Sequence, residues 1–179
     1  AVVVGVEAIS PLIVPVFRGK EPRKVRMRDK LAVYAFGDGA AAMVVMSEAA
    51  LKQSAAKAQV RIVDYEVTGV LPEIMGIGPV PAVRAVLDRQ GLTLADIDLI
   101  ELNEAFAAQV IACDRELRFD SQRLNVNGGA IALGHPIGCT GVRITTALMH
   151  EMGRRGSKLG ISTLCVSGGM GIALLIESV

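Results

Sequence analysis

The sequence predicts an α/β protein with buried strands and an aliphatic core. Hydrophobic residues make up 51% of the chain, whereas aromatic residues make up only 3%. The 179 residues include 19 glycines, which punctuate short apolar runs. Apolar runs of strand length, alternating with segments of helical periodicity, are typical of sheets covered by helices.

The first third of the chain contains fewer clear signals. The β-branched run at residues 1–6 predicts a buried strand, and residues 11–17 form an extended or edge piece because Pro15 lies inside it. Residues 18–30 are charged and aperiodic, which predicts a loop. After the apolar run 43–46, residues 47–58 predict a helix capped by Ser47.

From residue 60 onward, predicted strands are interspersed with predicted helices. Residues 60–70 predict a strand, and the loop at 76–81 leads into a helix in which Val80, Val83 and Leu87 recur at helical spacing before Gly91 ends it. The remaining predicted elements are a strand at 97–102, a helix starting at 103–109, a helix at 142–152, and strands at 159–165 and 171–176 joined by a hairpin turn at 167–169.

The composition excludes several classes of function. A net charge of +1 predicts no nucleic-acid partner. Three widely spaced cysteines do not form a disulfide framework, so we expect a reducing compartment, the cytoplasm or an organelle matrix. No apolar run is long enough to span a membrane, and no secretory signal peptide is visible.

The stretch from Asn125 to Gly141 is the first candidate site. It contains His135, one of two histidines, between Gly134 and Pro136. Glycines allow close approach of a ligand or of a second backbone segment. A helix predicted to follow at once places the imidazole near a helix N-terminus, where neutral imidazole is favoured. We therefore expect the ring to face a cleft.

Two further residues stand at the ends of predicted strands, where open α/β sheets bind ligands. Asn103 follows a strand and opens a predicted helix, and its spacing alone favours a helix N-cap over a functional role. Cys165 ends an apolar strand before a glycine turn; a buried core residue is the commonest role of a free cysteine, and a thiol that faces a cleft is the functional alternative. Cys113 and His150 are interpreted as core and surface residues, and Cys139 as a packed loop residue, with pairing to His135 as the alternative. The spacings match no zinc or dinucleotide-binding motif.

Taken together, three motifs resemble the thiolase family. They are Asn103-Glu-Ala-Phe106, Asn127-Gly-Gly-Ala-Ile-Ala-Leu-Gly-His-Pro-Ile-Gly138 and Cys165-Val-Ser-Gly-Gly-Met-Gly171, in the family's order. The resemblance extends over residues 64–177 and is weaker before them. It implies a layered α/β fold with a mixed five-stranded sheet and helices on both faces. Residues 59–179 are then the C-terminal thiolase domain, and residues 1–58 a remnant of the N-terminal half with a shortened loop region.

The resemblance also implies an activity. Family members are acyltransferases that act on acyl-CoA thioesters, by thiolysis of 3-ketoacyl-CoA or by the reverse Claisen condensation, through a cysteine acyl-enzyme. By this resemblance His135 activates the nucleophile and helps to hold the thioester oxygen, Asn103 holds a water there, and Cys165 moves the α-carbon proton.

Further implications concern the surroundings of the site. Backbone amides at Ser167 and Gly168 contribute an oxyanion hole, and Gly134 and Phe106 contact substrate. Coenzyme A is a substrate, and no cofactor or metal is implied. The family further suggests fatty acid metabolism and a homodimer or homotetramer.

The chain departs from the family pattern in three places. The nucleophilic cysteine is absent, Ser167 replaces a glycine, and the loop region between residues 11 and 36 is short. Either the printed chain omits parts of an active parent enzyme, or it is a truncated relative that acts as an inactive scaffold or CoA-binding subunit. The intact motifs favour the first interpretation.

Overall fold

The computed structural model of the protein describes residues 2–7, 39–52 and 60–179. In chain order the elements are β1 (Val2–Glu7), β2 (Gly39–Val44), α3 (Glu48–Leu51), β3 (Val60–Gly69), the 3₁₀ helix η2 (Pro72–Ile77), α4 (Pro79–Gln90), the 3₁₀ helix η3 (Leu94–Asp96), β4 (Leu99–Leu102), α5 (Ala107–Leu117), α6 (Ala130–Leu133), α7 (Thr140–Arg155), β5 (Leu159–Val166) and β6 (Met170–Ser178). The pieces predicted at residues 11–17 and 18–30, the shortened loop region, and the end of the helix predicted over 47–58 lie outside the described residues.

The principal sheet is mixed, as predicted. Its strand order is β3-β6-β5-β4, with β4 and β5 parallel and the other neighbours antiparallel. Beyond β4, Leu124 forms an isolated parallel bridge to Ile100. Within the described residues this sheet thus has four strands and one bridging segment, where the resemblance implied five strands.

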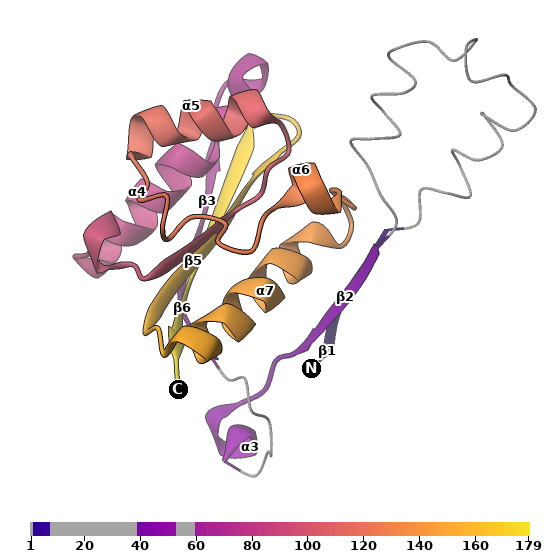
Figure 1. Ribbon diagram of the computed structural model, residues 1–179, viewed down its shortest axis with the longest axis vertical. Coiled ribbons are helices and arrows are strands. Elements are labelled where there is room, and N and C mark those ends of the chain that lie inside the picture. The colour runs from indigo at the N-terminus through magenta and orange to yellow at the C-terminus, as the bar shows by residue number, and fades with distance from the viewer. Residues whose placement is uncertain (1, 8–38, 53–59) are drawn as a thin grey trace, which may run out of the picture.

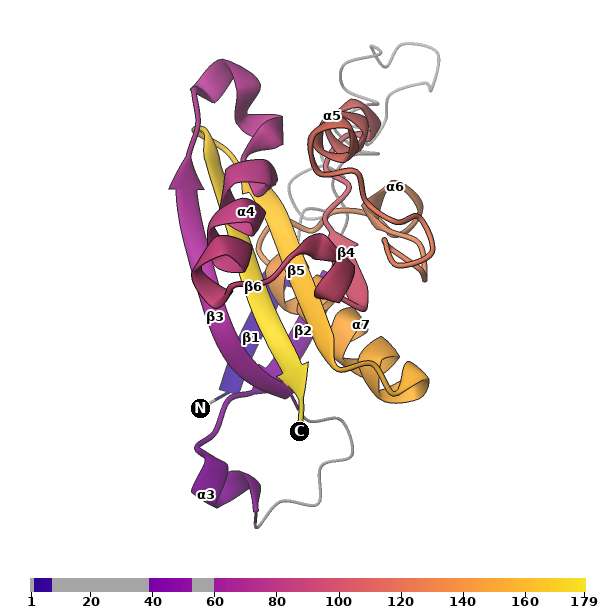
Figure 2. The ribbon, with the colours of Figure 1, turned by 90° about the vertical axis from the view of Figure 1, so that its left-hand side faces the viewer.

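Helices cover both faces of this sheet (Figures 1 and 2). On one face α4 and α5 enclose a core that includes Val83, Val86, Leu102 and Ile161. On the other face α7 packs against β4 and β5 and also contacts β1 and β2, which pair with each other. Helix α7 therefore lies between the four-stranded sheet and the β1–β2 pair (Figure 1). The predicted layered fold class is confirmed.

Local signals explain where the helices begin and end. Proline at the first position of α4 costs no hydrogen bond, and Gly91 ends that helix with a φ of 64°. Helix α7 begins two residues earlier than predicted, continues through Gly153 and ends at Gly156, whose φ is 66°. The 3₁₀ helix η2, which precedes α4, is not predicted from the sequence.

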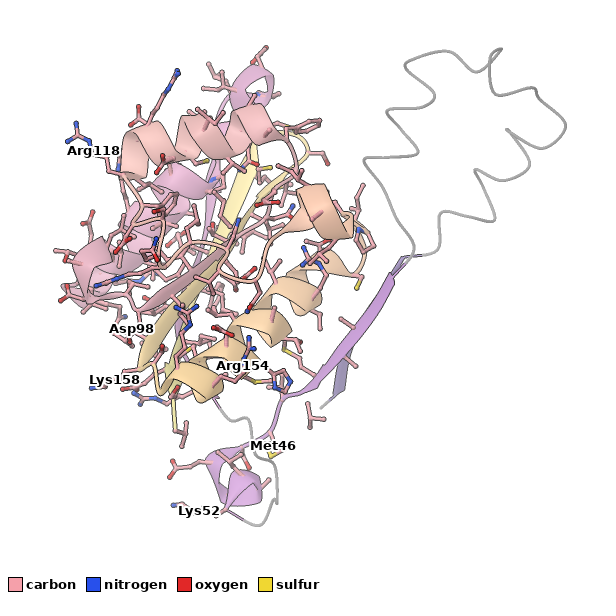
Figure 3. All side chains as sticks on the ribbon, in the orientation of Figure 1. Met46, Lys52, Asp98, Arg118, Arg154 and Lys158 are labelled. Atoms are coloured by element: carbon pink, nitrogen blue, oxygen red, sulfur yellow. The ribbon has the colours of Figure 1, made fainter. Side chains whose placement is uncertain are left out.

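The strands β4 and β5 are tied together at the end remote from the candidate site. The Asp98 carboxylate accepts hydrogen bonds from the backbone amides of Lys158 (2.7 Å) and Leu159 (2.9 Å). Figure 3 shows Asp98 beside Lys158 at this end of the sheet. This connection aligns the two parallel strands, so that β4 ends at Leu102 beside Thr163, three residues before β5 ends at Val166.

Candidate active site

Asn103 lies immediately after β4, at the carboxyl end of a fully buried strand. Its backbone amide donates to the Thr163 carbonyl (2.9 Å) on β5, and only 1% of the residue is exposed. The N-cap interpretation of Asn103 is wrong, because α5 begins at Ala107 and its N-cap is Phe106. The sheet, not the helix, therefore determines where the Asn103 side chain lies.

The structure brings Asn103 and His135 together across 32 positions of sequence. The Asn103 amide nitrogen Nδ2 lies 3.4 Å from Nε2 of His135. On the opposite side of the ring, Nδ1 of His135 lies 2.7 Å from the hydroxyl of Thr140. The carbonyl oxygen of the Asn103 side chain is buried and has no hydrogen-bond partner. A buried acceptor without a donor is costly, so this oxygen suits a donor from a ligand or water.

The loop that carries His135 is held against β4 by two polar side chains. Asn125 bonds to both backbone groups of Leu102, at 2.9 Å each, and so extends the edge of the sheet. Glu104 accepts from the Asn125 side chain (3.2 Å) and from the backbone amide of Ile131 (3.0 Å). Gly129 leaves room for this carboxylate, because a Cβ there would lie 2.3 Å from Cδ of Glu104.

Cys165 lies near the carboxyl end of β5, on the strand that pairs with β4. It is 6% exposed, and burial raises the pKa of its thiol. A protonated thiol at neutral pH can donate a proton before it accepts one. Cys113 is fully buried on α5, where burial raises its pKa to about 11. That placement suits the core role expected for Cys113.

The turn after Cys165 is fixed by contacts between backbones. Gly168 and Gly169 have φ values of 85° and 90°, which glycine adopts without strain. Ser167 is not among the described non-glycine residues with positive φ. A serine therefore fits at this position without the strain that its departure from the family's glycine suggested.

Two glycines allow neighbouring segments to approach the same turn. A Cβ on Gly169 would lie 2.2 Å from the Val70 carbonyl oxygen, and a Cβ on Gly171 would lie 1.9 Å from that of Gly78. Val70 also donates its backbone amide to the Gly169 carbonyl (2.6 Å). The segment before α4 thus fixes the turn of the predicted oxyanion hole.

Large apolar side chains are exposed on the segments around His135. Phe106 is 55% exposed, and Ile131, Leu133 and Ile137 are exposed to 64%, 64% and 58%. Gly134, which precedes the histidine, has a φ of 91°. Of these residues, only Phe106 and Gly134 are expected from the family resemblance to contact substrate. The alternation of apolar and small residues in the loop was the available signal for the others.

Two polar residues near the site were missed. Thr140 is 1% exposed and contacts the histidine ring; its only sequence signal is its position five residues after His135. Glu101 is 4% exposed on β4, and burial raises its pKa to about 7 despite the nearby positive charge of Arg143. An acidic residue within an apolar strand was the signal for Glu101.

Other features lie apart from this site. A cavity of about 880 Å³ lies between β2, α7 and the β3–β6 edge, lined by residues that include Met43, Met149 and Ile176. His150 is exposed on α7, as expected, and Cys139 is buried as the N-cap of that helix. Within residues 2–7, 39–52 and 60–179, no helix is long and apolar enough to cross a membrane.

Comparison with known proteins identifies the family. Residues 56–178 match the family model described as "Thiolase, C-terminal domain". The chain belongs to the thiolase family.

Individual relatives agree with that assignment. The chain is 56% identical over 140 residues to the acetyl-CoA acetyltransferase of Escherichia coli (strain K12), which covers 78% of this chain and 36% of the relative. It is 52% identical over 141 residues to the mitochondrial 3-ketoacyl-CoA thiolase of Homo sapiens, covering 79% and 36%. The crystal structure of that human thiolase in complex with CoA superimposes with a TM-score of 0.76 at 51% identity, over 80% of this chain and 36% of that one. This thiolase chain thus spans about a third of the length of these relatives.

Proposed function

We propose that the chain supplies the C-terminal half-site of an acyltransferase acting on acyl-CoA thioesters. The reaction is thiolysis of a 3-ketoacyl-CoA or the reverse Claisen condensation. The observation that carries the proposal is the contact between Asn103 and His135 at the carboxyl end of β4, beside the strand that ends near Cys165. The family membership and the relatives' names support the same chemistry.

His135 is proposed to act as the general base. In the proposed reaction, Nε2 takes the proton of a nucleophilic cysteine thiol, and the thiolate attacks the acyl carbonyl to form a thioester acyl-enzyme. The resulting imidazolium and the Asn103 amide hydrogens then face the same region, where they stabilise negative charge on a thioester oxygen. None of the three cysteines of this chain lies in the sequence context of the family's nucleophile.

Cys165 is proposed to move the proton at the substrate α-carbon. In condensation its thiolate removes that proton, and the electron pair passes to the thioester carbonyl as an enolate. In thiolysis the thiol returns the proton to the leaving carbanion. Burial raises the pKa of this thiol, which suits the proton-donating direction. Backbone amides of Ser167 and Gly168 are proposed to hold the second oxyanion, with Gly134 and Phe106 contacting substrate.

The domain assignment and assembly follow from the same proposal. Residues 59–179 would be the C-terminal thiolase domain and residues 1–58 a remnant of the N-terminal half. We also propose coenzyme A as a substrate, no other cofactor, a homodimer or homotetramer, a cytoplasmic location and a role in fatty acid metabolism. Sedimentation velocity of the purified chain tests the assembly directly.

A domain exchange tests the proposed function. Residues 60–178 of this chain replace the matching C-terminal third of the E. coli acetyl-CoA acetyltransferase, and the chimera is assayed with acetoacetyl-CoA and CoA. We expect activity within about tenfold of the parent enzyme, a loss of about 1.4 kcal/mol in transition-state stabilisation. A folded chimera that binds CoA but does not turn over favours the alternative, an inactive scaffold or CoA-binding subunit. The 179-residue chain alone is the matched control, for which no thiolysis is expected.

A further inference from the structure

We propose that Thr140 is a positioning residue that fixes the tautomer and the ring orientation of His135. The inference deepens the proposed function and rests on it for its catalytic meaning. The tautomer assignment itself depends only on the hydrogen bonds around the His135 ring. Thr140 lies at the first position of α7 and touches no atom that reacts, so its effect passes entirely through His135.

The hydrogen-bond directions around Thr140 determine which ring nitrogen carries the proton. The Thr140 hydroxyl has one hydrogen, and it donates that hydrogen to the Pro136 carbonyl oxygen (2.9 Å). The same hydroxyl lies 2.7 Å from Nδ1 of His135, so it accepts the hydrogen bond in that contact. Nδ1 therefore carries the hydrogen in the neutral ring, and Nε2 keeps its lone pair.

The Asn103 side chain favours the same His135 tautomer from the other side of the ring. Its side-chain nitrogen Nδ2 can only donate hydrogen bonds, and it faces Nε2 of His135 at 3.4 Å. A donor at this position matches an unprotonated Nε2. Two contacts from separate segments of the chain thus favour one tautomer, the one in which the base atom faces the buried Asn103.

The position of the Thr140 hydroxyl is determined by the helix and not by a ligand. Thr140 is 1% exposed, and the carbonyl of Pro136 also accepts the backbone amides of Cys139 (2.9 Å) and Thr140 (2.8 Å). Two buried residues further along α7, Ile144 and Leu148, hold the helix in place; both are 1% exposed. The N-terminus of this 16-residue helix also favours a neutral imidazole over a charged one. The ring is therefore held before any substrate arrives.

This arrangement explains why a hydroxyl is needed at position 140. When Nε2 takes a proton from the nucleophile, the imidazolium keeps its Nδ1–H bond to Thr140, while the hydrogen bond from Asn103 Nδ2 to Nε2 is given up. Valine has nearly the shape of threonine but no acceptor, so Thr140→Val frees the ring to adopt the other tautomer. Serine keeps the acceptor, so Thr140→Ser preserves the arrangement.

Nitrogen NMR of the ¹⁵N-histidine-labelled 179-residue chain tests the tautomer without any assay of turnover. The chain has two histidines, so the variant His150→Gln assigns both. At a pH where the ring is neutral, we expect Nδ1 of His135 to be protonated and Nε2 to be unprotonated. Thr140→Ser retains this pattern, whereas Thr140→Val changes the tautomer ratio by about fivefold or more, the loss of one ordinary hydrogen bond. A wild-type ring protonated on Nε2, or a Thr140→Val ratio equal to wild type, overturns the proposal.

Kinetics of the chimera described above test the catalytic consequence. We expect Thr140→Val to lower kcat about tenfold with KM nearly unchanged, and Thr140→Ser to restore kcat. Equal kcat for all three proteins contradicts the positioning role. An inactive chimera counts against the proposed function alone, because the NMR result still decides the tautomer. If Thr140→Val does not fold, the wild-type spectrum remains decisive.

Discussion

The two walls of the candidate site are built differently. The loop at residues 125–141, which carries His135, is held by polar side chains: Glu104, Asn125 and Thr140 contribute its hydrogen bonds. The turn at residues 167–171, which follows Cys165, is held by backbone groups that meet backbone groups. The first wall depends on charge and on hydrogen-bond direction, whereas the second depends on the absence of side-chain atoms.

This difference has consequences for tolerance to substitution. A side chain that loses its place can rotate away, so an error in the His135 wall is partly relieved. Backbone in contact with backbone cannot move without displacing β6 or α4. We therefore expect the Cys165 wall to respond to small changes of volume, and the His135 wall to respond to pH and to polar substitutions.

The largest expected effect is in the Cys165 wall. In Gly171→Ala the new Cβ would lie 1.9 Å from the Gly78 carbonyl oxygen, so either β6 or the start of α4 must shift. We expect a loss of about 3 kcal/mol or more in the free energy of unfolding, measured by urea denaturation. Gly153→Ala is the matched control: it lies within α7, no atom lies within 4 Å of the new Cβ, and it should be neutral or slightly stabilising. Equal stability of the two variants would break the distinction between the walls.

The next effect concerns Glu101 on β4, the strand against which the His135 wall is held. Burial raises the pKa of its folded-state carboxyl from 4.5 to about 7. Between these values the folded state binds more protons than the unfolded state, so stability falls as the pH rises from about 4.5 and levels off above about 7. The total decline from this group is on the order of 3 kcal/mol.

Glu101→Gln removes the titrating group and tests that slope. We expect the variant and the wild type to have similar unfolding free energies near pH 4, with the variant more stable near pH 8. Urea denaturation across this range measures both curves. Parallel curves would show that Glu101 is not the group responsible. Half-buried Asp64, whose pKa is lowered from 3.8 to about 2 by hydrogen bonds from Arg89 and Gln90, contributes a slope of the opposite sign near pH 4, and that contribution is the same in both proteins.

A smaller effect is expected where a methyl group is added to the His135 wall. In Gly129→Ala the new Cβ would lie 2.3 Å from Cδ of Glu104, which is the end of a flexible side chain. Displacement of Glu104 sacrifices its bonds to Ile131 and Asn125, at a cost of about 2 kcal/mol. A double-mutant cycle with Glu104→Ala sharpens the comparison, because Gly129→Ala should then cost much less in the variant background than alone. Additive losses would mean that Glu104 is not what the new methyl group displaces.

The smallest effect is expected at Ser167. Because the described Ser167 backbone has no positive φ, glycine is not required there. Ser167→Gly should therefore lower the melting temperature slightly, by a free-energy change below about 1 kcal/mol. A clear rise in melting temperature would indicate that the serine is strained.

The sequence predicted most of the fold from residue 60 onward and part of the site. Strands and helices between residues 60 and 178 follow from local periodicity and from glycines that end helices. The motifs also identified His135 and Asn103, which the structure places in contact. Asn103 was harder to interpret, because its preference for helix N-caps competes with its position at the end of a strand.

The supporting residues could not be predicted in the same way. Thr140, Glu101 and Glu104 act through contacts with groups whose positions depend on how β4, the loop and α7 pack. Periodicity shows which residues share a face, but it does not show which polar atoms meet. The backbone contact between Gly171 and Gly78 is equally invisible, because it depends on the path of two distant segments.

We propose that Cys165 belongs to a thiolase site and is more than a buried core thiol. The most direct measurement compares Cys165→Ala with Cys113→Ala in the E. coli chimera, since both cysteines are buried and both have raised pKa values. We predict that Cys165→Ala lowers kcat by about 100-fold or more, while Cys113→Ala stays within a few-fold of the unsubstituted chimera. Equal activities of the two variants would contradict it.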